Sequence, residues 1–379
     1  FDDLIVLGAS AASTEADTIA AGDGDDAVYG NGGDDLFVIN TAGHGRIDTI
    51  TGGDGSDTLQ LNASVASFDY GQFGDSLEAI HINYNGEIAT FDATLLSGFA
   101  TTIAGYNDET SGDPGEVLRI NVRAGVAADM SALQFGDGFT DATDDVNIFG
   151  TNQADTITGT SISDQIDGGA GIDTLRLGGT TALNLNLSLV SNTSVGNIEG
   201  SSRINSIERI DLSTDTVSNT LTVNAKEVND LTGMNMLHTG SGTADGQTWI
   251  NVSGSPFTAS QPYHQLVVEG TSTDKVVITD AWLVAGTVSN GTNTYTVYNN
   301  VTTYAQLVID ARIQVTMPPL IQVKNLETLS TGFVINGQSA NDESGGSVSN
   351  VGDVNGDGLD DILVGAGFSD QGGTNTGRA

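Results

Sequence analysis

A large apolar residue recurs every nine positions near the start of the chain, at Ile19, Val28 and Phe37. An aspartate stands two positions before each of them, at Asp17, Asp26 and Asp35. One inward apolar side chain among polar neighbours is typical of a short strand, because strand side chains alternate between two faces. The Gly-rich residues in between favour tight turns, since Gly adopts positive φ values without strain. The pattern therefore predicts short strands and tight turns that alternate with a nine-residue period.

The period resumes after a slip of four residues, and it returns in a second run at residues 150–176. The first run continues with Asp48 and Asp57. The second run carries Asp155, Asp164 and Asp173, each followed two positions later by an aliphatic residue. Two units of nine residues complete one coil, so turns that are 18 residues apart are expected to stack on the same edge.

The segments outside these runs have few charges and alternate Val, Ile, Leu and Thr with polar residues, which predicts further strands. Asn290-Gly291 separates two such stretches and predicts a hairpin. Each run is followed by a Ser-aliphatic-Glu-x-Ile motif, at residues 76–80 and 206–210. A short segment that can form one or two helical turns comes next, at residues 91–96 and 223–228.

The composition makes aspartate the dominant chemistry of the chain. Asp and Glu number 49 against 11 Lys and Arg, a formal net charge of −38, and 38 of the acids are Asp. A nucleic-acid binder needs a basic footprint, so we expect no nucleic acid as partner. No run of ~18 apolar residues occurs, so we expect no membrane insertion. The absence of Cys excludes disulfides and thiolate metal sites, and the 38% hydrophobic content argues against disorder.

Stacked aspartate turns are suited to calcium. A carboxylate from each of two turns, together with backbone carbonyls, can supply the roughly 6–8 hard oxygens that Ca²⁺ prefers. We therefore expect several calcium ions as cofactors, one shared by Asp17 and Asp35 and one by Asp155 and Asp173. The alternative, that these aspartates only cap solvated turns, is the weaker interpretation of a motif match.

The remaining aspartates of the runs are less well paired. Asp26 has His44 at the position 18 residues later, so its site depends on Asp48 after the slip. Asp164 has Val146 and Ala182 at the 18-residue positions, so we expect its site to be empty or half-made. The candidate ligands of the two runs also include Asp57 and four turn glycines, Gly22, Gly24, Gly169 and Gly171.

A different oxygen-rich loop lies near the end of the chain, at residues 353–361. Positions 1, 3, 5 and 9 of the loop carry polar oxygens and position 7 offers a carbonyl, so the candidate calcium ligands are Asp353, Asn355, Asp357, Leu359 and Asp361. An EF-hand needs a Glu at position 12 followed by a helix, but Val364 stands there in a strand-like stretch. The EF-hand interpretation is therefore weak.

Two resemblances carry further expectations. The nonapeptide blocks, such as Gly168-Gly-Ala-Gly-Ile-Asp173-Thr-Leu175-Arg, resemble the Gly-Gly-x-Gly-x-Asp-x-U-x repeats of the RTX family. Residues 332–366 are similar to one FG-GAP repeat, the calcium-loop blade of integrin-type propellers. Residues 265–315 resemble modules of very large bacterial RTX adhesins. These resemblances imply a large secreted adhesin or surface-layer-like protein, exported by type 1 secretion and located outside the cell or on its surface.

The expected fold is all-β, with short calcium-binding parallel β-roll (solenoid) blocks alternating with β-sandwich-like or irregular β modules. Because the chain starts at Phe1 without a signal peptide and stops within the last repeat, we expect a piece of a larger protein. The expected domains are an RTX block at 1–60, a β module at 61–145, a second RTX block at 146–178, a β-rich module at 179–330 and a partial FG-GAP repeat at 331–379.

No catalytic motif stands out, and we expect no enzyme. The histidines lie far apart in sequence, without the His-Glu-x-x-His spacing of a zinc protease. The leading hypothesis is a calcium-dependent extracellular structural or adhesive module that folds on calcium binding after secretion. The alternatives are an accessory region of a secreted RTX-type enzyme, or a module that binds a glycan, a peptide or ice. Self-association and a surface or host ligand are left open as partners.

Overall fold

The structure is a computed structural model of the 379-residue chain. It describes residues 4–6, 16–20, 27–40, 49–62, 65–68, 72–73, 77–83, 88–105, 115–136, 138–140, 144–161, 164–177, 181–190, 204–239, 242–300, 302–318, 344–352 and 361–366. The chain divides into two compact units, residues 1–319 and 320–379, and each is described by itself.

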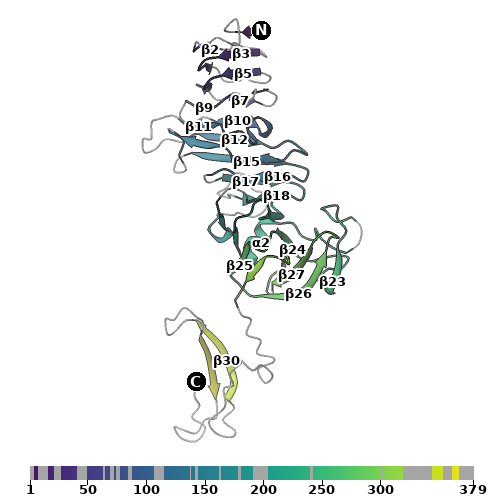
Figure 1. Cartoon of the computed structure of the whole chain (residues 1–379). Coiled ribbons are helices and arrows are strands. Elements are labelled where there is room, and N and C mark those ends of the chain that lie inside the picture. Colours follow the sequence, from purple (N-terminus) through teal and green to yellow (C-terminus); the bar gives the residue numbers. More distant parts are fainter. Residues whose placement is uncertain are drawn as a thin grey trace. The chain divides into compact units, whose positions relative to one another are not determined.

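The first unit is a solenoid of parallel strands stacked coil upon coil (Figure 1). One four-stranded sheet contains, in spatial order, β1 (Leu4–Val6), β3 (Ala27–Gly32), β5 (Thr49–Asp54) and β8 (Gln72–Phe73). A six-stranded sheet contains β14 (Gln134–Gly136), β11 (Thr102–Ala104), β9 (Ala79–Ile82), β6 (Thr58–Leu61), β4 (Leu36–Ile39) and β2 (Thr18–Ala20). Because consecutive strands of the chain alternate between these two sheets, the first block forms flat coils with one sheet on each side.

Two further parallel ladders continue the stack. One contains β20 (Ile204–Asn205), β17 (Asp164–Gly169), β15 (Asp145–Thr151), β12 (Val117–Asn121), β10 (Ile88–Asp92) and β7 (Val65–Phe68). The other contains β19 (Asn184–Asn186), β22 (Thr220–Val223), β25 (Lys275–Ile278) and β29 (Gln314–Thr316). Three short helical segments follow strands among the described residues, namely α1 (Ala93–Leu96) after β10, the 3-10 turn η1 (Leu187–Leu189) after β19 and α2 (Ala225–Leu231) after β22. The two segments expected to form helical turns thus do so, each with a side-chain cap from Asp92 or Asn224.

The nine-stranded sheet combines parallel and antiparallel pairing. Its order is β13 (Ala128–Asp129), β16 (Thr156–Thr158), β18 (Thr174–Arg176), β21 (Arg209–Asp211), β24 (His264–Glu269), β28 (Ala305–Asp310), β27 (Thr294–Asn300), β26 (Trp282–Ser289) and β23 (Ile250–Gly254). Strands β26, β27 and β28 pair antiparallel, and the Asn290-Gly291 hairpin is confirmed between β26 and β27. Gly291 takes a φ of 89° there, a conformation that favours glycine.

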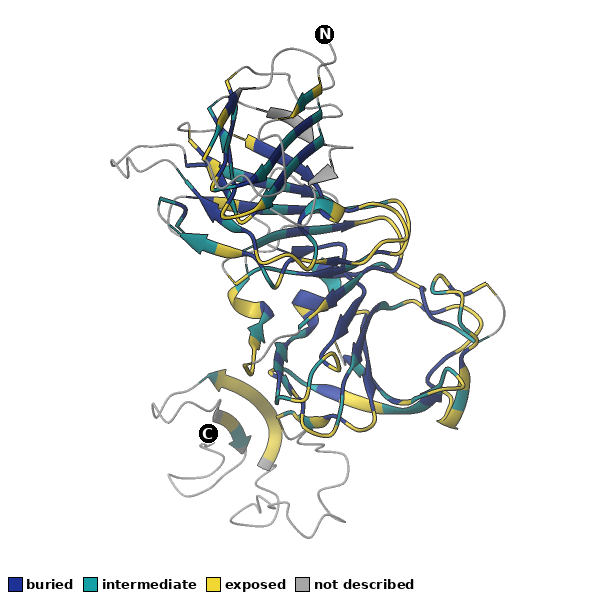
Figure 2. Ribbon diagram, turned by 45° about the horizontal axis from the view of Figure 1, so that its top comes forward, coloured by how far each residue is buried: buried dark blue, intermediate teal, exposed yellow. Residues whose placement is uncertain are grey.

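The solenoid has one continuous apolar core, drawn as the dark blue inner positions in Figure 2. The period-nine residues that were expected to point inward do so, and Ile19, Val28, Phe37, Ile157 and Ile166 are all at most 5% exposed. A second cluster, which includes Trp249, Phe257 and Tyr295, fills the space beneath the antiparallel strands. Each coil therefore buries its apolar side chains against the coils above and below.

The expected change of architecture at residue 61 does not occur. Strand β6 pairs in parallel with β9, and β10, β12 and β15 form one continuous ladder across residues 88–151. The described residues of 61–145 therefore continue the solenoid instead of forming a β-sandwich-like module. The physical reason is that each of these strands supplies inward apolar residues, as Leu118 and Ile120 do in β12, so glycine-rich turns are not needed to stack them. Among the described strands of the region 179–330, the antiparallel strands β23, β26, β27 and β28 depart from the parallel pattern.

The second unit contains an antiparallel pair, β30 (Ser344–Gly352) and β31 (Asp361–Ala366). Val364 pairs with Val348 in this ladder, so the strand expected after the oxygen-rich loop is confirmed. Among the described residues, no helix is both long and apolar enough to cross a membrane.

Candidate calcium sites

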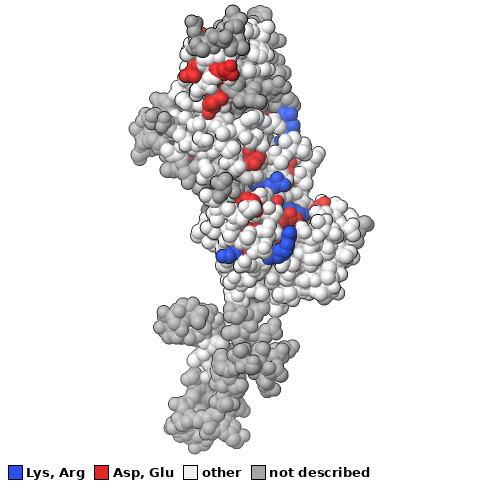
Figure 3. All heavy atoms as spheres, in the orientation of Figure 1, with Lys and Arg blue, Asp and Glu red and all other residues white. Residues whose placement is uncertain are grey.

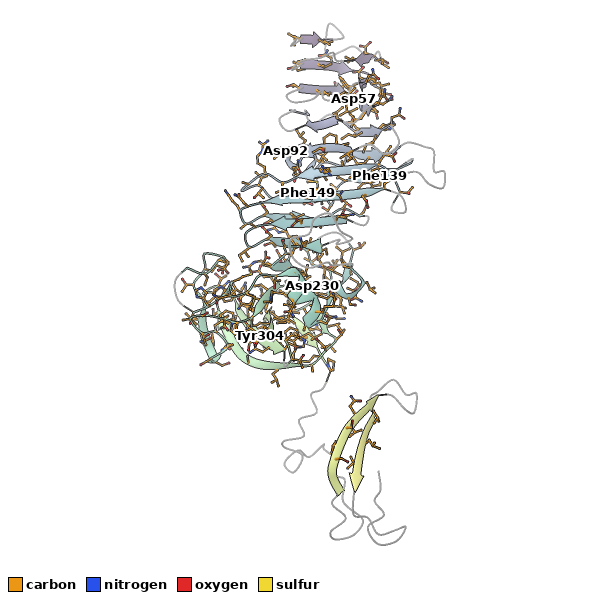
Figure 4. All side chains as sticks on the ribbon, turned by 180° about the vertical axis from the view of Figure 1, so that it is seen from behind. Asp57, Asp92, Phe139, Phe149, Asp230 and Tyr304 are labelled. Carbon is orange, nitrogen blue, oxygen red and sulfur yellow. The ribbon has the colours of Figure 1, made fainter. Side chains whose placement is uncertain are left out.

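Acidic residues form a hydrogen-bonded ladder along one edge of the first block. Asp17, Asp35, Asp57 and Glu78 stand immediately before β2, β4, β6 and β9, in four successive coils. The backbone N–H of Asp17 donates to Asp35 Oδ1 at 2.8 Å, and that of Asp35 donates to Asp57 Oδ1 at 2.8 Å. The N–H of Asp57 donates to Glu78 Oε2 at 2.7 Å. Each carboxylate therefore receives the N–H of the acidic residue one coil earlier (Figure 4, which labels Asp57).

The second block repeats the arrangement with Asp155, Asp173 and Glu208, which precede β16, β18 and β21. The N–H of Asp155 donates to Asp173 Oδ1 at 2.7 Å, and the N–H of Asp173 donates to Glu208 Oε2 at 2.9 Å. The predicted partners Asp17 and Asp35, and likewise Asp155 and Asp173, are thus stacked on one another. Sequence reasoning missed the contacts of Asp57 with Asp35 and Glu78, and of Asp173 with Glu208.

Each ladder leaves carboxylate oxygens buried without a hydrogen-bond partner. These atoms are Asp35 Oδ2, Asp57 Oδ2, Asp155 Oδ1 and Asp173 Oδ2. The four side chains are at most 2% exposed. A buried anionic oxygen without a partner is strongly destabilising, so native proteins pair it or bind a cation beside it.

A glycine faces one of these oxygens. A Cβ built on Gly30 would overlap both Asp35 Oδ2 and the carbonyl oxygen of Gly52, so a carboxylate oxygen and a carbonyl oxygen converge on one small space. Two converging oxygens repel each other unless a cation or a donor lies between them, and hard oxygens of these two types are ligands that Ca²⁺ prefers. The residues present therefore fit a calcium ion.

The turns have the conformation that the glycine spacing predicts. Gly169 and Gly171 have φ values of 93° and 142°, and Gly53 and Gly55 in the first block have 116° and 148°. A Cβ on Gly171 would lie 2.7–2.8 Å from backbone atoms of the preceding turn, at Gln153 and Ala154. Glycine is thus needed both for the left-handed backbone and for the close stacking of turn upon turn.

The first ladder concentrates negative charge away from the basic side chains that the structure describes. The described residues of the chain up to Ile82 include no Lys or Arg, and on the face drawn in Figure 3 the acidic side chains of this block stand apart from the basic ones. At the ~4.8 Å spacing of neighbouring strands, two carboxylates repel by roughly 3 kcal/mol at an effective dielectric constant of 20. A divalent cation between the coils would reverse the sign of this interaction.

Burial, like the repulsion between neighbouring carboxylates, makes the charged form of these acids less favourable. Desolvation raises the pKa of Asp173 to about 7 and that of Glu208 to about 8, with a smaller contribution from the neighbouring carboxylates. Desolvation also raises the pKa of Asp57 above its usual value, although the N–H of Asp35 opposes the shift. The fold therefore holds these carboxylates where their charge is unfavourable unless a cation accompanies them.

The expected calcium sites combine carboxylates with backbone carbonyls and are not clusters of side chains alone. No group of three or more acidic or histidine side chains converges on one point in the part of the chain that the structure describes. In a stacked roll each coil contributes one carboxylate to an edge, so a site contains two carboxylates and takes its other oxygens from carbonyls. Bound calcium would thus be held by Asp17 with Asp35, Asp35 with Asp57, and Asp155 with Asp173, together with turn carbonyls such as that of Gly52.

Asp164 differs from the other aspartates of its run. Its register partner in the preceding coil is Val146, as the 18-residue spacing predicts. Both of its carboxylate oxygens accept hydrogen bonds from Thr160, Oδ2 from the N–H at 2.8 Å and Oδ1 from the hydroxyl at 2.6 Å. Asp164 thus caps its own turn.

The other candidate ligands lie outside the described residues. They are Asp26, Asp48, Gly22 and Gly24 in the first run, and Asp353, Asn355, Asp357 and Leu359 in the C-terminal loop. Asp361 opens β31, and the structure describes its backbone only. These residues remain candidate ligands from the sequence.

Two family profiles match parts of the chain. The RTX calcium-binding nonapeptide repeat, in a form of four copies, matches residues 11–38, 43–64 and 147–179. The chain contains RTX calcium-binding repeats. Such repeats bind calcium ions and are typical of secreted proteins. The FG-GAP repeat matches residues 344–379, which confirms the second resemblance. No curated protein and no solved structure matches the chain.

The RTX matches agree with the geometry of the ladders. They include Asp17, Asp35, Asp57, Asp155 and Asp173, the aspartates that stack in successive coils. Calcium binding by the RTX region is therefore supported by the repeats and by the buried oxygens independently. Glu78 and Glu208, which continue the two ladders, lie beyond the matched residues.

Proposed function

We propose that the chain is a calcium-dependent extracellular structural module of a large RTX-type surface protein, that it folds on calcium binding after secretion, and that it catalyses no reaction. The observation that carries the proposal is the set of buried, unpartnered aspartate oxygens in both RTX blocks. Metal-free, these oxygens oppose folding, because the unfolded chain exposes them to water. With calcium they become ligands, so the binding free energy is folding free energy.

The calcium affinity expected of the sites relates folding to the compartment in which the chain lies. Calcium sites of extracellular modules have a Kd of roughly 10⁻⁴–10⁻³ M. Sites of this affinity stay empty at the low free calcium inside a cell and fill outside it, so the chain can be exported unfolded. The stacked parallel strands among the described residues of 18–316 support a structural role, because coils that share one core form an extended scaffold.

The experiment is a calcium titration followed by far-UV circular dichroism, starting in excess chelator. We expect a strand spectrum that develops with calcium in the millimolar range and is lost again on chelation, with magnesium at the same concentration as the control. A full strand spectrum in chelator, with a melting temperature that calcium leaves unchanged, would contradict the proposal.

We further propose that the structural module serves adhesion. The adhesive role is supported by the resemblance of residues 265–315 to modules of very large RTX adhesins, a stretch that forms the antiparallel strands β26–β28. The length and flanking repeats of the full gene product test it. Many further modules beside this one are expected, whereas a neighbouring catalytic domain would favour the alternative of an enzyme's accessory region.

A further inference from the structure

The glutamate of the Ser-aliphatic-Glu-x-Ile motif that follows each RTX block is the next acidic residue of that block's ladder. Each residue whose side chain accepts an N–H from the previous coil is called a rung of the ladder. Glu78 and Glu208 occupy the same place in the two blocks, and each accepts the N–H of the last nonapeptide aspartate. The backbone contacts also match. The carbonyl of Asp57 accepts from residues 78 and 79, both at 3.1 Å, and that of Asp173 from residues 208 and 209, at 3.1 and 3.0 Å.

The coil that contains each glutamate crosses between the sheets by a shorter path. From Ile166 to Thr174 the chain advances eight residues, whereas between their register partners Ile204 and Arg209 it advances five. The backbone at Glu208 nevertheless stays in contact with Asp173, since the N–H groups of residues 208 and 209 both donate to the Asp173 carbonyl. A glutamate, whose side chain is longer than that of aspartate by one methylene group, continues the ladder at this position.

Ser206 has a left-handed backbone in the coil that contains Glu208, unlike Gly168, on which it stacks. It follows Asn205, the register partner of Asp167, and so stacks on Gly168. Its φ of 51° is left-handed, which is uncommon for serine. A Cβ built on Gly168 would overlap both the Ser206 carbonyl oxygen and Asp173 Oδ2, which therefore face one small space, as Gly52 O and Asp35 Oδ2 do inside the first block.

The hydrogen-bond partners of the buried carboxylates distinguish Asp173 from Asp274, a buried aspartate of the solenoid that needs no ion. Asp173 is fully buried with Oδ2 unpartnered, and Glu208 is 6% exposed. Asp274 is also a buried rung, since it accepts the N–H of Asn219 at 3.0 Å through Oδ1. However, its Oδ2 accepts from both the N–H and the hydroxyl of Thr271, at 2.7 and 2.9 Å. Both carboxylate oxygens of Asp274 thus have hydrogen-bond partners, whereas one oxygen of Asp173 has none.

We propose that each RTX block ends in an additional calcium site outside the nonapeptide repeats, formed by the last aspartate of the block and the glutamate of the Ser-aliphatic-Glu-x-Ile motif. In the second block the ligands are Asp173, Glu208 and the carbonyl of Ser206. In the first block Asp57 and Glu78 take the same roles. The inference rests on the proposed calcium-dependent function and adds one ion to each block.

The test counts bound calcium in the full 379-residue chain by elemental analysis after equilibrium dialysis at millimolar calcium. Glu208→Gln keeps a side-chain oxygen that can accept the N–H of Asp173 but removes the charge. We expect this variant to bind one calcium ion fewer per chain, Glu78→Gln to bind one fewer, and the double variant to bind two fewer. Asp274→Asn is the matched control and is expected to bind the wild-type number.

A second measurement separates a ligand from a structural acid. The melting temperature of Glu208→Gln should rise less with calcium than that of the wild type, while at the lowest calcium at which both fold the two should melt together. Equal calcium counts in wild type and both glutamine variants would overturn the inference, as would a melting temperature lowered equally at every calcium concentration. A wild-type chain that binds no calcium would instead refute the proposed function itself.

Discussion

Asp35→Asn is the most informative single substitution in the first block. Asp35 is the middle rung, since its Oδ1 accepts the N–H of Asp17 and its own N–H donates to Asp57. Its Oδ2 is buried without a partner and converges with the carbonyl oxygen of Gly52. An asparagine can keep the first hydrogen bond through Oδ1 and donate from Nδ2 to Gly52. The substitution thus preserves the packing and removes one charge and one calcium ligand.

The expected effect changes sign with calcium. At 10 mM calcium, a site with a Kd of roughly 10⁻⁴–10⁻³ M contributes about 1.4–2.7 kcal/mol to stability, and the variant should lose that amount for each of the two sites that Asp35 shares. At low calcium the variant is relieved of repulsion between neighbouring rungs, roughly 3 kcal/mol for a pair at an effective dielectric constant of 20. We therefore expect it to be less stable than wild type at high calcium and equal or more stable at low calcium.

The assay is the melting temperature over a series of calcium concentrations, from the lowest at which the wild type folds up to 10 mM. The slope of melting temperature against the logarithm of calcium concentration reports how many ions bind on folding. It should be smaller for Asp35→Asn and unchanged for Asp164→Asn, because both oxygens of Asp164 already accept from Thr160. Parallel curves for Asp35→Asn and wild type would refute the assignment of Asp35 as a calcium ligand.

Three further predictions test the fold. Gly168→Ala should abolish the calcium-dependent melting transition, because the added Cβ would overlap the Ser206 carbonyl and Asp173. Gly98→Ala is the control, since nothing lies near its Cβ, and it should lower the free energy of unfolding by only about 1 kcal/mol. Similar melting of the two variants would contradict the close stacking of turns. Leu221→Ala should lower the free energy of unfolding by about 2–5 kcal/mol at every calcium concentration, because the fully buried Leu221 lies in β22 and belongs to neither acidic ladder. A loss of stability that depends on calcium would argue against this. Burial raises the pKa of Tyr295 to about 12, so its contribution to stability should persist below pH ~10 and be lost towards pH ~12. In a phenolate absorbance titration, Tyr295→Phe should remove one tyrosine that ionises near pH 12, and an unchanged titration would contradict this.

The nine-residue period was sufficient to predict the strands, their inward residues and the stacking of Asp17 on Asp35. It was insufficient for Asp35 and Asp57, because the four-residue slip changes the separation of stacked turns from 18 to 22 residues. Only strand register shows where the extra residues lie. Glu208 was visible in a motif, but its contact with Asp173 spans 35 residues, which include the strand β19 of an additional sheet.

The segment 61–145 shows a different limit of sequence reasoning. The nonapeptide repeat is not matched between residues 65 and 146. The alternation of apolar and polar residues in this segment is equally typical of a β-sandwich and of a solenoid face. What decides between them is the pairing partner. Leu118 in β12 stacks between Ala89 and Val146, all fully or nearly fully buried, and such a parallel stack of inward residues leaves no cue in the local pattern.

The continuity of the solenoid extends the influence of calcium beyond the residues that bind it. In a stacked array each coil contacts only its neighbours, so stability is a sum of local terms and neighbour interfaces. Strand β9 stacks on β6 of the first block, and β15 of the second block stacks on β12. The segment between the blocks therefore has a calcium-dependent coil on each side. Loss of calcium would remove the ordered neighbours on which those coils pack, so the middle of the solenoid should depend on calcium although it contains no nonapeptide repeat.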